Sequence, residues 1–172
     1  TQGDPLAIPM YGVGVVPLSR EIKRVDVKQS WYTDDSVGLG KLLALLMWFI
    51  NLMNRGPKSG YFPEPSMCIL VLKEGFENRA KELFSDFDIQ IVHATKFLGG
   101  YIGKEDEIKS FVRGKVEKWV QYVDIFSKAA VKFPQAVYAA FTKSLQSEWN
   151  YMQRAIPCNG DEYRDLKKEI ER

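Results

Sequence analysis

Residues 25–36 read Val-Asp-Val-Lys-Gln-Ser-Trp-Tyr-Thr-Asp-Asp-Ser, and they decide how the first half of the chain is built. Val25, Val27 and Trp31 stand at even spacing, which is typical of a β-strand with one buried face. The run Thr-Asp-Asp-Ser then supplies the small polar residues of a turn. The stretch therefore predicts a β-hairpin with two adjacent aspartates, Asp34 and Asp35, at its tip.

Helices and further strands are predicted on both sides of this hairpin. Asp4 and Pro5 provide an N-cap and a first helical residue, and a continuous apolar run at 68–72 is typical of a strand covered on both faces. The predicted elements are a helix over 5–16, a buried helix over 41–54, a strand over 68–72, a helix over 77–84, a strand over 89–92 and a strand or tight hairpin over 97–103. Together they predict an α+β layer.

The pattern changes near Gly103-Lys104. From Glu105 onward apolar residues recur at helical spacing and predict a long amphipathic helix. Phe133-Pro134 breaks it, a second helical stripe runs from Val137 to Met152, and a polar helix follows Pro157. We therefore expect residues 1–103 to form an α+β part and residues 104–172 an all-helical part.

Composition excludes several classes of protein. The 172 residues are 45% hydrophobic and 27% charged, with a net charge of +2 that is too weak to indicate nucleic acid or membrane by itself. Cys68 and Cys158 frame no disulfide or zinc pattern, and His93 alone cannot form a multi-histidine metal site. The apolar run at 42–53 is too short to span a bilayer. The expectation is a globular protein of a reducing compartment, without a membrane span.

Asp34 and Asp35 have two readings from the residues alone. Adjacent carboxylates repel, and a bound cation relieves that repulsion. Magnesium takes oxygen ligands and typically uses one or two protein carboxylates plus substrate phosphates. An isolated Asp-Asp pair is more often a solvated turn, so the pair needs a context to indicate chemistry.

Four motifs supply that context. Tyr32-Thr33-Asp34-Asp35 resembles the Tyr-x-Asp-Asp box of reverse transcriptases, and residues 1–6 resemble the Gln-Gly-x-Pro-Leu motif that precedes it. The segment from Gly60 to Cys68 looks like the loop before the next palm strand, and Phe97-Leu98-Gly99 is similar to the motif that holds the primer. The order and spacing match the polymerase region of eukaryotic retrotransposons over essentially the whole chain.

The resemblance implies a fold and a reaction. Residues 1–103 would be the C-terminal part of a polymerase palm, an antiparallel sheet with packed helices, and residues 104–172 a helical thumb. The activity would be RNA-directed DNA polymerisation on an RNA template and DNA primer with deoxynucleotide triphosphates, inside the cell in cytoplasm or nucleus. Asp34 and Asp35 would bind two Mg²⁺ ions.

Further roles follow from the same resemblance, residue by residue. Tyr32 would lie against the primer terminus, and Gln2 and Gly3 would face the incoming nucleotide and the template. The primer grip would consist of Phe97, Leu98 and Gly99.

Two departures from the family pattern qualify this reading. The family's third catalytic aspartate precedes the Gln-Gly motif, and neither Asp4 nor Asp26 matches it. A lysine usual in the loop before the palm strand is replaced by Met67, and Lys73 lies at the other end of that strand. We therefore expect a fragment that does not polymerise alone.

Two rival functions remain open. The first is a non-catalytic remnant, or nucleic-acid-binding module, that acts through the helical part or binds nothing. The cations of that part could face phosphates or form an ordinary solvated face. These cations are Lys109, Arg113, Lys128, Lys132 and Lys143. The second is an RNA-dependent RNA polymerase, which would usually carry Gly-Asp-Asp, against which Tyr32-Thr33 argues.

Overall fold

The computed structural model describes residues 4–156 and 160–171. The chain divides into two compact units. The first unit takes the chain up to Leu70 together with Gly75–Ile91, and the second takes Val71–Glu74 and the chain from Val92 onward. None of the helices in the described part of the chain is both long and apolar enough to cross a bilayer.

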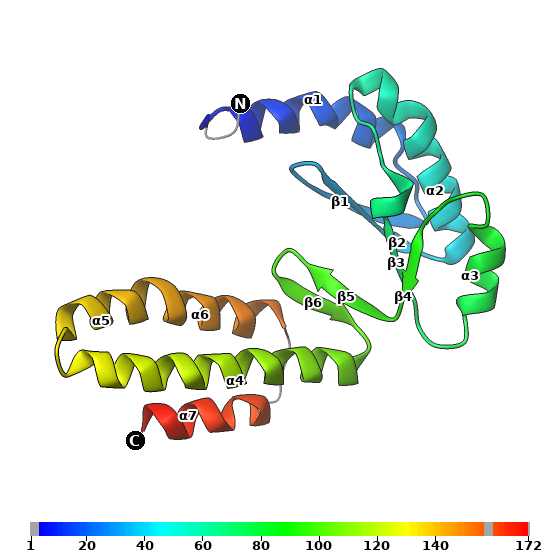
Figure 1. The fold of residues 1–172 in the computed structure, drawn as a ribbon. Coiled ribbons are helices and arrows are strands. Elements are labelled where there is room, and N and C mark those ends of the chain that lie inside the picture. The colour runs from blue at the N-terminus through cyan, green and yellow to red at the C-terminus, as the bar shows by residue number, and fades with distance from the viewer. Residues whose placement is uncertain (1–3, 157–159, 172) are drawn as a thin grey trace. The chain divides into compact units, whose positions relative to one another are not determined.

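The first unit mixes helices with short strands (Figure 1). Its elements are α1 (Ala7–Glu21), β1 (Val27–Tyr32), β2 (Asp35–Gly40), α2 (Leu42–Arg55), the 3₁₀ turns η1 (Gly56–Ser59) and η2 (Pro65–Met67), the strand β3 (Ile69–Val71), α3 (Glu77–Leu83) and β4 (Gln90–Val92). Strands β3 and β4 extend one residue into the second unit.

The first helix begins later and ends later than the sequence predicts. Leu6 occupies the N-cap position, and the carboxylate of Asp4 accepts a hydrogen bond from the Leu6 amide at 2.9 Å. Asp4 therefore caps the turn that precedes the helix. The helix continues through Pro17, because the core contacts of Leu18 and Ile22, both fully buried, outweigh the backbone hydrogen bond that a proline removes.

The predicted hairpin is confirmed, with a shorter turn. Strands β1 and β2 pair antiparallel in a register that sets Tyr32 opposite Asp35, so the turn contains only Thr33 and Asp34. Val25 lies outside the strand. The hairpin packs against α2, where the Trp48 indole donates a 2.8 Å hydrogen bond to the side chain of Gln29. The core residues are Leu18, Ile22, Val27, Ala44, Trp48, Phe49 and Leu52.

Strands β3 and β4 pair differently. The Gln90 amide donates to the Cys68 carbonyl and the Leu72 amide donates to the Val92 carbonyl, so both bonds advance along the two strands in the same direction. That is the pattern of a parallel pair joined through α3. Ile69 is 44% exposed, so the predicted covering of both faces is wrong for this strand. A lone pair of strands has too few neighbours to bury both faces.

The second unit holds a hairpin and a helical bundle (Figure 1). Its elements are β5 (Ala94–Phe97), β6 (Gly100–Gly103), α4 (Glu105–Ala130), α5 (Pro134–Ala140), the π-helical segment η3 (Phe141–Leu145), α6 (Gln146–Ala155), the 3₁₀ turn η4 (Asp161–Tyr163) and α7 (Arg164–Ile170). Helix α4 runs between the α5–α6 pair and α7. The α+β class is confirmed, and the described strands form three two-stranded sheets instead of one antiparallel sheet.

The bundle is held by aromatic and aliphatic side chains from α4 and α6. Trp119 is 1% exposed, and its indole donates a 2.9 Å hydrogen bond to Glu148 of α6. The second predicted stripe is interrupted by the π-helical segment, which turns Phe141 edge-on to Trp149 at 5.2 Å. Tertiary packing therefore inserts an irregularity that helical periodicity does not encode. Pro157, predicted to stop this stripe, lies outside the described residues.

Candidate active-site hairpin

The tip of the β1–β2 hairpin presents Tyr32, Asp34 and Asp35. Tyr32 ends β1, Asp34 lies in the turn and Asp35 begins β2. Tyr32 is 61% exposed, and both aspartates are exposed. Tyr32 and Asp35 are register partners, and side chains of antiparallel partners lie on the same face of the ribbon. The tip therefore offers two open carboxylates beside a phenol.

Backbone strain is present at this tip. Thr33 has φ +51° although it is β-branched, and a β-branched residue rarely adopts a positive φ. The Thr33 hydroxyl lies 2.9 Å from Asp34 Oδ1 and 2.7 Å from the Tyr32 carbonyl. Strain of this kind persists only when surrounding contacts hold the backbone.

Tyr61 supplies such contacts from the loop after η1. Its hydroxyl donates to the carbonyl of Asp34 at 2.9 Å and lies 3.0 Å from Ser36 Oγ. Its ring packs edge-on against Trp31, with 5.4 Å between ring centroids. Burial raises the pKa of Tyr61 above its usual value of 10.0, and the hydrogen bond with Ser36 opposes part of that rise.

A second tyrosine lies near the same turn. Burial raises the pKa of Tyr11 on α1 above 10.0, and the negative charge of Asp34 raises it further. Tyr11 therefore stays protonated beside the carboxylate, with a hydroxyl that can donate a hydrogen bond.

The predicted primer-grip residues lie at the tip of the other hairpin. Phe97 ends β5, and Leu98 and Gly99 form a two-residue turn with φ +45° and +78°. Positive φ at both central positions is the backbone of the turn that best matches strand twist in hairpins. Leu98 is 41% exposed, while the Tyr151 hydroxyl on α6 donates a hydrogen bond to its carbonyl.

The other residues singled out in the sequence lie outside the described part of the chain or at separate exposed positions. Gln2 and Gly3 lie outside the described residues. Met67 is 76% exposed at the end of η2, and Lys73 is an exposed residue just beyond β3. Within residues 4–156 and 160–171, no three His, Cys, Asp or Glu side chains come together in a group that could hold a metal ion.

The cations predicted to face nucleic acid are mostly engaged locally. Lys109 pairs with Glu105 at 2.7 Å, and Lys128 pairs with Asp124 at 2.6 Å, each one helical turn away. Lys132 lies over the ring of Phe133. Exposed ion pairs contribute little to stability, so a phosphate can compete for these lysines. The arrangement is equally typical of a solvated face.

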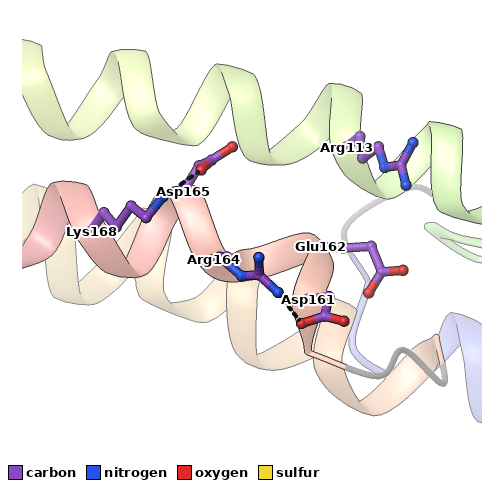
Figure 2. Close-up of a pocket in the computed structure, with 6 residues that line it drawn as sticks. All are labelled: Arg113, Asp161, Glu162, Arg164, Asp165 and Lys168. Atoms are coloured by element: carbon purple, nitrogen blue, oxygen red, sulfur yellow. Dashed lines mark hydrogen bonds and ion pairs between the residues drawn. The ribbon is translucent and has the colours of Figure 1, made fainter.

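One hollow in the second unit gathers charged residues, as Figure 2 shows. It measures about 320 Å³ and is lined by Arg113, Asp161, Glu162, Arg164, Asp165 and Lys168. Arg164 pairs with Asp161 at 2.6 Å, and Lys168 lies 3.7 Å from Asp165. Three cations face three carboxylates here, so the charge balance does not favour an anionic ligand.

The sequence does not predict the contacts that Tyr61 and Tyr151 make with the two hairpin turns. Tyr61 belongs to the predicted loop before the strand at 68–72, and Tyr151 lies in a predicted helical stripe. Neither position carries a local signal for contact with a turn. Their partners lie 27 and 53 residues away in the chain, which no short pattern specifies.

No family model matches this chain, and no match is found among curated proteins or among solved structures. The candidate site therefore stands on the motifs in the sequence and on the geometry described above.

Proposed function

We propose that this chain carries the palm hairpin and the thumb of an RNA-directed DNA polymerase related to those of eukaryotic retrotransposons. The observation that carries the proposal is the β1–β2 tip, where Tyr32, Asp34 and Asp35 of the Tyr-x-Asp-Asp motif are exposed together. The tight turn at Leu98-Gly99 and the helical unit that follows it support the same reading.

The donor set at the tip fits magnesium. Asp34 and Asp35 are consecutive, exposed carboxylates, and Mg²⁺ is usually bound by one or two carboxylates together with water and substrate phosphates. When bound, two such ions would activate the attacking hydroxyl and neutralise charge on the leaving oxygen. Asp34 and Asp35 would hold these ions at the tip of the hairpin.

The proposed reaction is transfer of a nucleotide to a primer. The primer 3′-oxygen forms a bond to the α-phosphorus of a deoxynucleotide triphosphate, the bond to the bridging oxygen breaks, pyrophosphate leaves, and the hydroxyl proton is released. Tyr32 would rest against the primer end, while Phe97, Leu98 and Gly99 would hold the primer strand. The protein's contribution is mainly position and charge, as in other phosphoryl transfers.

The test is magnesium-dependent primer extension on an RNA template. The protein assayed, called the extended polymerase below, is a fusion. The fingers and first palm strand of a reverse transcriptase precede residues 1–172, because that strand carries the family's third catalytic carboxylate. We expect extension that disappears when Asp34 and Asp35 are both changed to Asn. Asp26→Asn is the control for loss of a carboxylate, since it removes one such charge from a residue outside the hairpin tip.

The competing function is binding of nucleic acid without catalysis. In that case the chain would bind labelled primer–template with a steep salt dependence, the Asp34/Asp35 double variant would bind equally well, and no extension would be seen. That result would contradict the polymerase proposal.

A further inference from the structure

Tyr61 holds three positions of the β1–β2 hairpin at once. Its ring packs on Trp31 of β1, and its hydroxyl meets the Asp34 carbonyl in the turn and Ser36 of β2. A tyrosine hydroxyl has one proton, so when it donates to Asp34 the Ser36 hydroxyl must donate to it. The tyrosine is therefore bonded to the turn and to the strand that follows it.

Tyr151 makes the corresponding contact in the second unit. Its hydroxyl donates to the carbonyl of Leu98, the first turn residue of the β5–β6 hairpin. Its ring lies against Gly99, where an added Cβ would come within 3.2 Å of Tyr151 Cε1. The tyrosine thus reaches both residues of the turn from helix α6.

Both turns need an external support. A two-stranded hairpin is at most marginally stable by itself, and each of these turns contains a non-glycine residue at positive φ, Thr33 or Leu98. Residues that act on a substrate must be held within about 0.5 Å of the productive geometry by locked neighbours. In each hairpin the tyrosine hydroxyl is bonded to the turn carbonyl itself.

We propose that Tyr61 and Tyr151 are positioning residues that hold the tips of the two hairpins, Tyr61 for the aspartate-bearing tip and Tyr151 for the Leu98-Gly99 tip. The structural part of this proposal is independent of the polymerase assignment. Its catalytic consequence rests on the proposed function, in which Tyr61 sets where Asp34 and Asp35 stand and Tyr151 sets where the primer strand is gripped.

Amide hydrogen exchange on the chain itself tests the structural part. Tyr61→Phe keeps the ring and removes the hydroxyl, so we expect exchange at residues 33–36 to accelerate about 2- to 10-fold, the worth of one hydrogen bond. Tyr151→Phe should do the same at residues 98–100 only. Tyr138→Phe is the matched control, because its side chain is 72% exposed, and it should change neither turn.

Each result of the exchange experiment decides whether the two tyrosines hold the hairpin turns. Acceleration confined to the hairpin of the changed tyrosine supports the proposal, and unchanged exchange at both turns overturns it. If Tyr61→Phe fails to fold by circular dichroism, Ser36→Ala replaces it, since that change removes one hydroxyl contact and should still accelerate exchange at residues 33–36.

The catalytic consequence has a separate readout in the extended polymerase described above. Tyr61→Phe should lower kcat at least threefold with the KM for nucleotide unchanged, whereas Tyr151→Phe should weaken primer binding with kcat unchanged. Equal kcat for Tyr61→Phe and its parent would overturn the positioning role in catalysis. If the parent is inactive the polymerase proposal fails, and the exchange result still decides whether the tyrosines hold the turns.

Discussion

The β1–β2 and β5–β6 hairpins solve the same structural problem with different residues. Each has a two-residue turn with a non-glycine residue at positive φ, and each turn carbonyl accepts a hydrogen bond from a distant tyrosine. The first carries carboxylates at its tip and the second an exposed leucine beside a glycine. The turns differ in backbone as well, since φ is positive at both Leu98 and Gly99 but only at Thr33 in the first turn. What the hairpins share is a strained non-glycine residue and a tyrosine bonded to the turn, while the chemistry of each tip is set by two or three side chains.

The open ends of the two hairpins, called their bases here, are also alike. Gly40 pairs with Val27 and Gly103 pairs with Ala94, so a glycine stands at the open end of each hairpin. A Cβ would lie 2.7 Å from the Asp26 carbonyl at Gly40 and 2.1 Å from the His93 carbonyl at Gly103. Both bases require a close approach of two backbones, and the second is the tighter.

The largest expected effect is on the rate of nucleotide addition, which should depend on the first hairpin tip and not on the second. In the extended polymerase, Asp34→Asn should lower the rate of nucleotide addition by far more than tenfold, because it removes ligand charge from the metal site. Leu98→Ala should weaken primer binding and leave the rate at saturating primer within about threefold. Single-turnover kinetics with varied primer concentration measures both. Activity of Asp34→Asn within tenfold of the parent would refute the assignment of the first tip.

The next comparison concerns the two bases. Gly103→Ala should reduce the free energy of unfolding by about 3 kcal/mol, because it combines overpacking with a strained φ of +124°. Gly40→Ala should cost about 1–2 kcal/mol from overpacking alone. Urea denaturation followed by tryptophan fluorescence gives both values. A smaller loss at Gly103 than at Gly40 would show that the second base is not the tighter.

A smaller effect tests strain in the two turns. Asn tolerates the left-handed backbone better than a β-branched or long side chain. Thr33→Asn should raise the free energy of unfolding by about 1 kcal/mol and Leu98→Asn by about 0.5 kcal/mol, since the β-branched residue is the more strained. The alanine variants at these positions should show no such gain in the same denaturation assay.

An effect of similar size depends on pH and concerns helix α6, which carries Tyr151. Burial alone would raise the pKa of Glu148, but hydrogen bonds from Lys115 and Trp119 and the Lys115 charge outweigh it and hold that pKa below the ordinary 4.5. A carboxyl with a lowered folded pKa contributes its full stability above its unfolded pKa, and the contribution fades as pH falls through the folded value.

Glu148→Gln is the variant that isolates this contact. At pH 7 it should lower the free energy of unfolding by about 0.5–1 kcal/mol. The difference from the parent should shrink as pH falls below 4.5 and through the lowered folded pKa. Urea denaturation at a series of pH values measures it. Glu117→Gln, at an exposed position of helix α4, serves as the control. A difference that stays constant down to pH 3 would exclude Glu148 as the titrating group.

Much of the fold follows from local sequence patterns. Even spacing before Thr33 and small polar residues after Tyr32 predict the hairpin that carries Asp34 and Asp35, because strand periodicity and turn chemistry act over a few residues. Glycines near Leu98 likewise indicate the second tight turn. The candidate site residues of both tips were therefore accessible from the sequence, as was the change to helices near Lys104.

Tertiary structure alone decided the contacts that hold those tips and the packing around them. Tyr61 meets Asp34 across 27 residues and Tyr151 meets Leu98 across 53, and the π-helical segment at Phe141–Leu145 accompanies the contact of Phe141 with Trp149. The parallel pairing of β3 with β4 also depends on how α3 folds back between them. Local patterns encode which face of an element is apolar, whereas the partner that each face meets is set by the packing of the whole unit.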